Sequence, residues 1–329
     1  MDAELDRCLR EIWSQLEFNT SIVENTLGAT NHVFRVNSKP AFYLRQYRTD
    51  DIKKIQNEHE LLLKLSQDLA FVVAPCLTRT HSTIANIQGQ YYALFPEAHG
   101  RLIEQSELSI IHAFQAGSAL ANLHNYLAPF SGDKFPTIKL SWDKDAWVTR
   151  LNNIINMIES SGVEENVDHW ARRRAQQQRH YLAAATTANS YYPKTQTTLI
   201  HGDYHHFNVF FDAQSKVSGV IDWDLLQNMP PAYEIARACM YMFKMESKKS
   251  VAFIEGYMSE SEMSHEMLND GARAWGIYAD HHVWALEEVY LKGSISAQKF
   301  IPQSEFKPFI EQWLPIEKAL FGATDDEST

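Results

Sequence analysis

Two aspartate-containing segments joined by a short hairpin constrain this 329-residue chain more than any other feature. The segment HGDYHHFN spans residues 201–208, and GVIDWD follows at 219–224. Between them, VFFDAQSKVSGV has the β-branched and aromatic composition of two strands, with DAQS as the turn. The spacing therefore predicts a loop that carries Asp203 and Asn208, followed by a hairpin that ends at Asp222.

This order of residue types suits phosphoryl transfer to a hydroxyl group. Such a reaction needs an acidic side chain that orients the attacking hydroxyl and accepts its proton, and hard oxygen ligands that hold Mg²⁺ on the nucleotide phosphates. Asp203 fits the first role, and Asn208 and Asp222 fit the second. The protein-kinase signature has the same order, with an Asp, an Asn and then a metal-binding Asp. The pattern therefore predicts a transferase that depends on ATP and Mg²⁺.

The same segments resemble the motifs of a known superfamily. HGDYHHFNVFF and GVIDWD are similar to the HGDxxxxN and IDxD motifs of the aminoglycoside phosphotransferase, choline kinase and type II homoserine kinase superfamily. The resemblance extends upstream through AGSALANLH, YYALFPEAHGR, NEHELLLKL, FYLRQY and LGATNHVFRV, and it covers roughly residues 20–240. It implies a two-lobed protein-kinase-like fold that transfers a phosphoryl group from ATP.

The resemblance also implies roles for individual residues. Asp203 would be the catalytic base, and Asn208 and Asp222 would ligate Mg²⁺. Glu58 would pair with a cation at Arg45, where many relatives carry Lys; an Arg can still grip phosphate oxygens bidentately. The other expected nucleotide-binding residues are in the glycine-poor loop and the interlobe hinge: Gly28, Asn31, Phe95 and Glu97.

The order of the expected elements predicts an α+β fold. Strand-like stretches HVFRV, AFYLRQY and YYALF flank a helical segment at 50–69, whereas the chain after Gly100 has helical apolar spacing, interrupted by β-rich residues at 198–222. We therefore expect a small sheet-rich nucleotide-binding lobe at 1–97 and a larger helical lobe at 98–329 that carries catalytic and substrate groups. The cleft between them is the expected ligand site.

A late helical segment is a candidate for the acceptor site. In GARAWGIYADHHVWALEEVYLK, Asp280, Trp284 and Glu287 recur at helical spacing. Aromatic rings and carboxylates together can bind an ammonium group, although aromatic stripes also belong commonly to cores. Both interpretations stay open, and Asp224 is a further candidate contact for the acceptor.

Composition limits the partners. The net charge is −11, and the one basic run is short, so no nucleic-acid surface is expected. No apolar run approaches the roughly 20 residues of a membrane span, and the three cysteines are far apart, so a cytoplasmic protein with reduced thiols is expected. His201, His205 and His206 lack an evident further zinc ligand and are expected to be structural, with His201 bracing the loop.

Three functions remain open at this point. The leading one is a kinase for a small hydroxylated molecule: an aminoglycoside, a choline-like amine, homoserine or a sugar. A bacterial stress-response Ser/Thr protein kinase is an alternative, because YYALFPEAHGRLIEQ and the NEH of the helical segment also resemble that group. A non-catalytic nucleotide-binding regulator is the third, and the intact Asp203, Asn208 and Asp222 count against it. The sequence predicts no particular oligomeric state.

Overall fold

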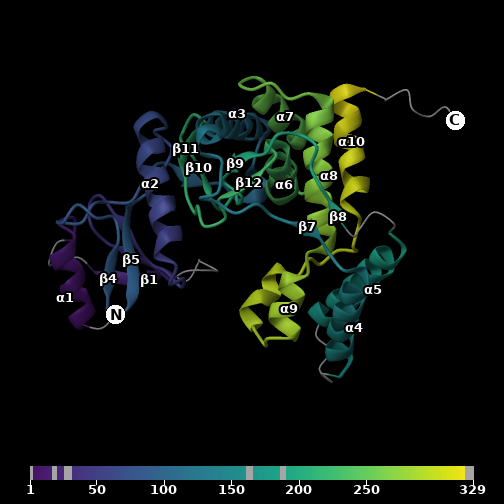
Figure 1. Ribbon diagram of the computed structural model, residues 1–329, viewed down its shortest axis with the longest axis horizontal. Helices are drawn as coiled ribbons and strands as arrows, with labels where there is room; N and C mark the ends of the chain where they lie inside the picture. The colour runs from purple at the N-terminus through teal and green to yellow at the C-terminus, as the bar shows by residue number, and fades with distance from the viewer. Residues whose placement is uncertain (1–2, 17–20, 26–31, 161–165, 186–189, 323–329) are drawn as a thin grey trace.

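A sheet-rich lobe and a helical lobe make up the protein (Figure 1), as the predicted α+β class requires. The computed structural model describes residues 3–16, 21–25, 32–160, 166–185 and 190–322. The helices are α1 (Ala3–Ile12), α2 (Ile52–Asp68), α3 (Ile110–Leu127), α4 (Lys144–Ser160), α5 (Asn166–Ala184), α6 (Pro231–Phe243), α7 (Ser247–Met258), α8 (His265–His281), α9 (Trp284–Tyr290) and α10 (Phe309–Phe321). The strands are β1 (Ile22–Asn25), β2 (His32–Val36), β3 (Phe42–Gln46), β4 (Ala85–Ile87), β5 (Gln90–Pro96), β6 (Arg101–Leu102), β7 (Leu140–Ser141), β8 (Ser190–Tyr191), β9 (Thr198–Ile200), β10 (Val209–Phe211), β11 (Val217–Val220) and β12 (Gln227–Met229).

The N-terminal lobe is an antiparallel sheet in the order β1-β2-β3-β5-β4, with α2 packed beside it (Figure 1). The three predicted strand stretches are confirmed as β2, β3 and β5. The predicted helix is confirmed as α2, which begins where the Asp51 carboxylate accepts the Lys54 N–H at 3.1 Å. The structure adds α1; its Leu9, and Trp13 directly after the helix, pack in the same core as Leu44 of β3.

The segment after α2 is hydrogen-bonded to the hairpin formed by β10 and β11. The Val220 N–H, in β11, donates to the carbonyl of Phe71 at 2.7 Å, and Val72 forms a parallel bridge with Val220. Farther along the chain, β6 pairs with β10 of the same hairpin. We propose residues 97–100 as the connection between the lobes, and the division at residue 97 stays a prediction.

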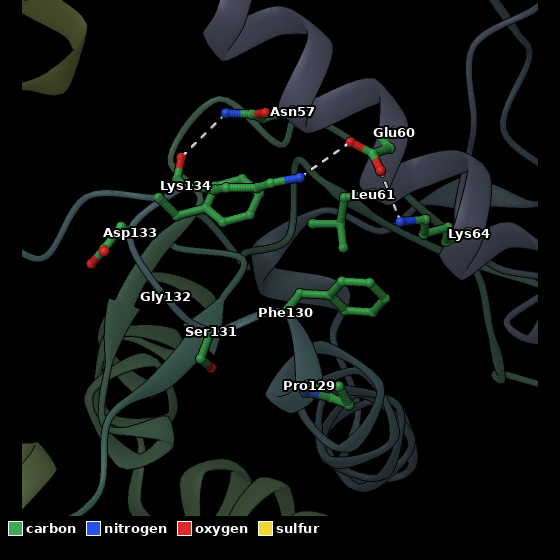
Figure 2. A pocket seen from close by; sticks show the side chains of 11 residues that line it. Asn57, Glu60, Leu61, Lys64, Pro129, Phe130, Ser131, Gly132, Asp133 and Lys134 are labelled. Atoms are coloured by element: carbon green, nitrogen blue, oxygen red, sulfur yellow. Dashed lines mark hydrogen bonds and ion pairs between the residues drawn. The ribbon is translucent and has the colours of Figure 1, made fainter.

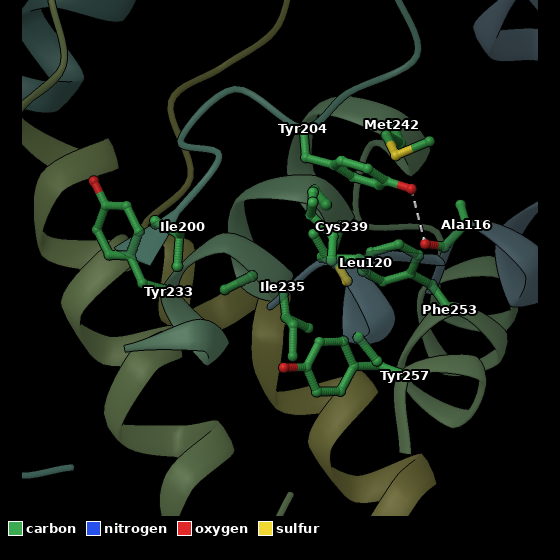
Figure 3. Packing of buried hydrophobic residues seen from close by; sticks show 14 of the residues in the cluster. Ala116, Leu120, Ile200, Tyr204, Tyr233, Ile235, Cys239, Met242, Phe253 and Tyr257 are labelled. Carbon is green, nitrogen blue, oxygen red and sulfur yellow. Dashed lines mark hydrogen bonds between the residues drawn. The ribbon is translucent and has the colours of Figure 1, made fainter. Parts of the chain in front are cut away.

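The C-terminal lobe is built on α3, α6, α7, α8 and α10, which pack around one large hydrophobic core (Figures 1 and 3). Tyr204, the residue after Asp203, inserts its fully buried ring into this core, and its hydroxyl donates to the carbonyl of Ala116 in α3 at 3.0 Å (Figure 3). Packing of Tyr204 in the core therefore fixes the position of the candidate catalytic loop. None of the described helices is long and apolar enough to cross a bilayer.

The late segment predicted as one helix forms two. Helix α8 ends at His281, His282 and Val283 are not helical, and α9 begins at Trp284. The physical reason is packing: Trp275 of α8 belongs to the main core, whereas Val283 and α9 pack against α4 and α5 in a separate cluster. The chain must turn to reach the second cluster, so the continuous helical periodicity of the sequence is overridden by tertiary contacts.

Candidate active site

The structure brings the three predicted catalytic and metal-binding residues together. The Asn208 side-chain amide donates to Oδ2 of Asp203 at 3.0 Å and to the main-chain oxygen of Asp203 at 2.9 Å. The Asn208 carbonyl then accepts the N–H of Ile221 at 3.0 Å, which joins the loop to the residue before Asp222. One hydrogen-bonded unit therefore holds the loop and the far end of the hairpin in register.

Two backbone positions make this unit possible. Gly202 has φ +82°, and a Cβ there would lie 2.0 Å from the carbonyl oxygen of Leu225, so only Gly fits. Asp222 has φ +63°, in a region that non-glycine residues rarely adopt but that Asp tolerates. Such strain concentrates at functional sites, where the surrounding structure imposes it.

Buried Glu234, which the sequence analysis did not single out, holds the catalytic loop from beneath. Its carboxylate accepts the backbone N–H groups of His201 at 3.0 Å, Gly202 at 2.6 Å and Tyr204 at 3.4 Å, and the Nε2–H of His124 at 2.9 Å. Burial acts to raise the pKa of Glu234, but the hydrogen bond from His124 and nearby positive charge outweigh it and lower that pKa. The group is therefore an ionised anchor for the loop.

We expect Glu234→Ala to lower the free energy of unfolding by about 3 kcal/mol or more, because it leaves several buried donors unpaired. The lowered pKa means that this stabilisation is present above the ordinary Glu pKa and is lost as pH falls. Urea unfolding between pH 4 and pH 8 measures it. Glu255→Ala, at an exposed site on α7, is the matched control and should change stability by less than about 0.5 kcal/mol. Equal stability of the two variants would contradict the anchoring role.

The histidines of the motif have different environments. His201 accepts the Asp203 N–H on Nδ1 at 3.1 Å and donates from Nε2 to the carbonyl of Ile221 at 3.1 Å, so it braces the loop against the hairpin. Nε2 of His205 lies 3.4 Å from Oδ1 of Asp203. Within the described residues, no group of three His, Cys, Asp or Glu side chains is placed to hold a metal ion by itself.

Arg45 of β3 links the two lobes through charge. Its Nη1 lies 3.6 Å from Oε1 of Glu58, and its Nη2 lies 3.1 Å from Oδ1 of Asp222 and also pairs with Asp224. The forked guanidinium reaches all three carboxylates, which the single ammonium of a Lys would do less well. Burial raises the pKa of Glu58 to about 7, although the Arg45 charge opposes this shift.

Arg45 also contacts an aromatic ring, which is held in turn by a hydrogen bond to a histidine. The Tyr47 ring lies 4.9 Å from the guanidinium, and the Tyr47 hydroxyl lies 2.7 Å from Nε2 of His59. Nδ1 of His59 is 2.8 Å from the hydroxyl of Thr83. Burial, aided by the Arg45 charge, lowers the pKa of His59 to about 3, so this histidine is neutral and adds no competing charge.

The remaining nucleotide-binding predictions are not all covered by the structure. Gly28 and Asn31 lie outside the described residues. Phe95 lies near the end of β5 with its ring 5.8 Å from that of His59, and Glu97 follows the strand and pairs with Arg35 at 3.4 Å. Contact of these residues with a nucleotide stays a prediction.

The residues predicted for the acceptor do not share one helix, because of the break after His281. Asp280 is buried and accepts the N–H of Phe309 at 2.9 Å. Glu287 pairs with Arg150 of α4, and the Trp284 ring contacts that of Phe300. Their role in acceptor binding stays a prediction. Asp224 pairs with Arg45, as does the predicted metal ligand Asp222, and its contact with the acceptor also stays a prediction.

The pKa of Asp280 gives a separate prediction. Burial raises this pKa to about 7, so the folded state binds a proton more tightly than the unfolded state and stability falls as pH rises from about 4 to 7. Asp280→Asn should therefore be more stable than the parent at pH 8, by about 1 kcal/mol or more, with the difference shrinking toward pH 5. Thermal unfolding at both pH values checks this. A raised acceptor Michaelis constant without the stability change would favour a substrate role instead.

A second residue that sequence reasoning missed is Arg237 of α6. Its Nη2 pairs with Oδ1 of Asp203, and its guanidinium lies 4.7 Å from the ring of Tyr241. Burial acts to raise the pKa of Asp203, but the hydrogen bond from His205 and the Arg237 charge outweigh it and lower the pKa to about 2. Asp203 is therefore ionised at neutral pH.

A cavity of about 300 Å³ lies elsewhere, between α2 and the segment at 129–135 (Figure 2). Lys64 and Lys134 both reach Glu60 at its edge, at 2.9 and 3.4 Å. Its lining contains neither Asp203 nor Asp222. The candidate active site is therefore defined by the arrangement of its side chains and not by this cavity.

A family model described as the phosphotransferase enzyme family matches residues 21–274. The chain belongs to this family. The match spans the N-terminal sheet, the candidate catalytic loop and the hairpin, and it ends within α8 of the phosphotransferase. It confirms the resemblance and the prediction of a kinase or phosphotransferase that acts on a hydroxyl group. A search of curated proteins gave no significant match to the phosphotransferase sequence.

Solved structures share the fold of the phosphotransferase. A spectinomycin phosphotransferase in complex with ADP and spectinomycin is 13% identical, with a TM-score of 0.61 over 96% of this chain and 93% of that one. A microcompartment-associated aminopropanol kinase is 17% identical, with a TM-score of 0.60 over 96% and 98%. An amicoumacin kinase in complex with AMP-PNP and Ca²⁺ is 13% identical, with a TM-score of 0.58 over 94% and 97%. These similarities confirm the kinase-like fold class.

Proposed function

We propose that this phosphotransferase moves the γ-phosphoryl group of ATP to a hydroxyl group of a small molecule, with Mg²⁺ as its cofactor. The main support is that Asp203 and Asn208 are hydrogen-bonded at 3.0 Å, while Arg45 reaches Asp222 from the other lobe at 3.1 Å. These are the groups that phosphoryl transfer requires: one that orients the acceptor, oxygen ligands for a metal, and a cation for phosphate. Spectinomycin and aminopropanol, named for two structural relatives, are small hydroxylated molecules.

In this proposal the acceptor hydroxyl donates a hydrogen bond to Oδ1 of Asp203. Its oxygen forms a bond to the γ-phosphorus while the bond from that phosphorus to the β–γ bridging oxygen breaks, ADP leaves, and the hydroxyl proton passes to the Asp203 carboxylate. Because the pKa of Asp203 is lowered to about 2, this residue is a weak base that contributes mainly by orienting the hydroxyl.

The residues near Asp222 suit Mg²⁺. Asp222 and Asp224 offer carboxylate oxygens, and the Asn208 amide uses its nitrogen on Asp203, which leaves its oxygen for a cation. The Asp222 side chain is 36% exposed, so a metal bound to phosphate can reach it. Mg²⁺ is commonly held by one or two carboxylates together with substrate phosphates. When bound, it would neutralise phosphate oxygens, and Arg45 would supply a further positive charge to them.

An assay of ADP release from ATP tests the proposal, with and without Mg²⁺, against hydroxyl-bearing metabolites, aminoglycosides and a generic protein substrate. We expect Mg²⁺-dependent release that a small hydroxylated acceptor stimulates. Stimulation by the protein substrate alone would favour the stress-response protein kinase alternative. ATP binding without turnover on any acceptor would favour a regulator.

A further inference from the structure

One cation beside Asp203 has binding capacity that the proposed reaction leaves unused. Arg237 pairs with Asp203 through Nη2, and the rings of Tyr241 and Trp275 lie 4.7 and 5.7 Å from its guanidinium. Its side chain is 11% exposed, and among the described residues Nη1 is buried without a hydrogen-bond partner. The guanidinium is therefore held firmly in place, with one side of its fork unsatisfied.

His205 and Tyr241 lie beside the pair formed by Arg237 and Asp203. Nε2 of His205 is 3.4 Å from Oδ1 of Asp203. Burial raises the pKa of Tyr241, whose ring lies 4.7 Å from the Arg237 guanidinium. Arg237 therefore places a positive charge directly against the carboxylate that the acceptor hydroxyl is proposed to contact.

The acidic groups expected to attract a cationic acceptor already have protein partners. The Asp280 carboxylate is buried and accepts the N–H of Phe309, and Glu287 pairs with Arg150. Binding an ammonium group to either carboxylate would first require breaking these contacts. Asp280 and Glu287 therefore already have partners, whereas Nη1 of Arg237 has no hydrogen-bond partner among the described residues.

We propose that the acceptor carries a carboxylate or phosphate a few bonds from its reactive hydroxyl, and that Arg237 binds this anionic group. This inference rests on the proposed function. An acceptor hydroxyl on Oδ1 of Asp203 would lie beside Nη2, and in this proposal the neighbouring anion supplies the contact that Nη1 lacks among the described residues. One guanidinium nitrogen would then contact Asp203 and the other the acceptor's anion, and the positive charge between them would reduce the repulsion of the two anions.

Matched acceptors test the charge preference. A three-carbon set comprises glycerate, glycerol 3-phosphate, glycerol and 3-amino-1,2-propanediol, and a six-carbon set comprises gluconate, glucose 6-phosphate, glucose and glucosamine. We expect an anionic member to exceed its neutral counterpart by at least about 10-fold in kcat/KM, the effect of one charge-assisted hydrogen bond. The carboxylate and phosphate members distinguish the two anions. Preference for a neutral or cationic member, or Mg²⁺-ATP binding with transfer to none, contradicts this inference, whereas absence of Mg²⁺-ATP binding contradicts the proposed function itself.

Substitution at Arg237 tests the residue assignment. Arg237→Gln should raise KM for the anionic acceptor by about 10- to 100-fold while KM for the neutral member and for ATP change by less than about two-fold, and Arg237→Lys should recover part of the loss. Arg273→Gln, whose guanidinium in α8 lies over the ring of Tyr191 at 5.0 Å, is the matched control and should have no effect. If Arg237→Gln instead lowers kcat equally for anionic and neutral acceptors with both KM values unchanged, Arg237 only positions Asp203 and the proposal is wrong.

Discussion

Asp203→Asn is expected to reduce turnover by about 100-fold or more while leaving Mg²⁺-ATP binding nearly unchanged. The amide can neither orient the acceptor hydroxyl as a carboxylate does nor accept its proton, and a positioned proton acceptor typically contributes 10²- to 10⁴-fold. It also offers one oxygen where the carboxylate offers two, so it cannot satisfy Arg237 on one side and Asn208 on the other. Steady-state kinetics together with an ATP titration measure the two effects.

The matched control is Asp212→Asn, in the turn of the same hairpin. The Asp212 side chain accepts the backbone N–H groups of Gln214 and Lys216 through one oxygen, at 2.8 and 2.9 Å, and an Asn oxygen can replace it. Turnover of this variant should stay within about two-fold of the parent. Unchanged turnover in Asp203→Asn would remove Asp203 from the mechanism.

Asp222→Ala is expected to abolish the tightening of ATP binding by Mg²⁺. A carboxylate that connects the metal to the phosphates cannot be replaced by a methyl group, and the loss of such a contact weakens binding by about 10-fold or more. ATP titrations with and without Mg²⁺ give the comparison. Equal Mg²⁺ dependence in the variant and the parent would mean that the metal is held elsewhere.

A second variant separates metal binding from folding. Asp222 has φ +63°, where Ala is strained, but Asn tolerates this conformation. Asp222→Asn removes the negative charge at little conformational cost, so it should lose most of the Mg²⁺ dependence while its thermal stability stays close to that of the parent. Loss of Mg²⁺ dependence in the Ala variant alone would point to backbone distortion as the cause.

Local patterns predicted most of the elements that surround the site. Helix α2 follows the Asp51 cap, and the helical apolar spacing predicted after Gly100 is confirmed in α3 and α6. Asp203, Asn208 and Asp222 could be selected because they lie in two contiguous motifs whose spacing fixes their approach. The turn between α8 and α9 could not be predicted, because contacts with the distant α4 and α5 impose it.

Glu234 and Arg237 were missed for a different reason. Each makes its key contacts with residues of the catalytic loop about 30 positions earlier, so no local motif joins them to that loop. A usable signal was nevertheless present. PAYEIARACMYMF is an otherwise apolar helical segment with one acidic and one basic residue, and charged groups in a buried helix require partners. The catalytic loop upstream contains the partners that the structure shows: Asp203 for Arg237, and backbone N–H groups for Glu234.

Phosphorus-31 NMR of ATP, Mg²⁺ and the matched acceptors, incubated with the parent or with Asp203→Asn, follows the transferred group directly. With the parent we predict ADP and a new phosphate-ester resonance on one acceptor, and over the same period we predict almost no ester with the variant. An equal rate of ester formation by Asp203→Asn, or ADP accompanied only by inorganic phosphate in the parent reaction, would contradict phosphoryl transfer to a small-molecule hydroxyl through Asp203.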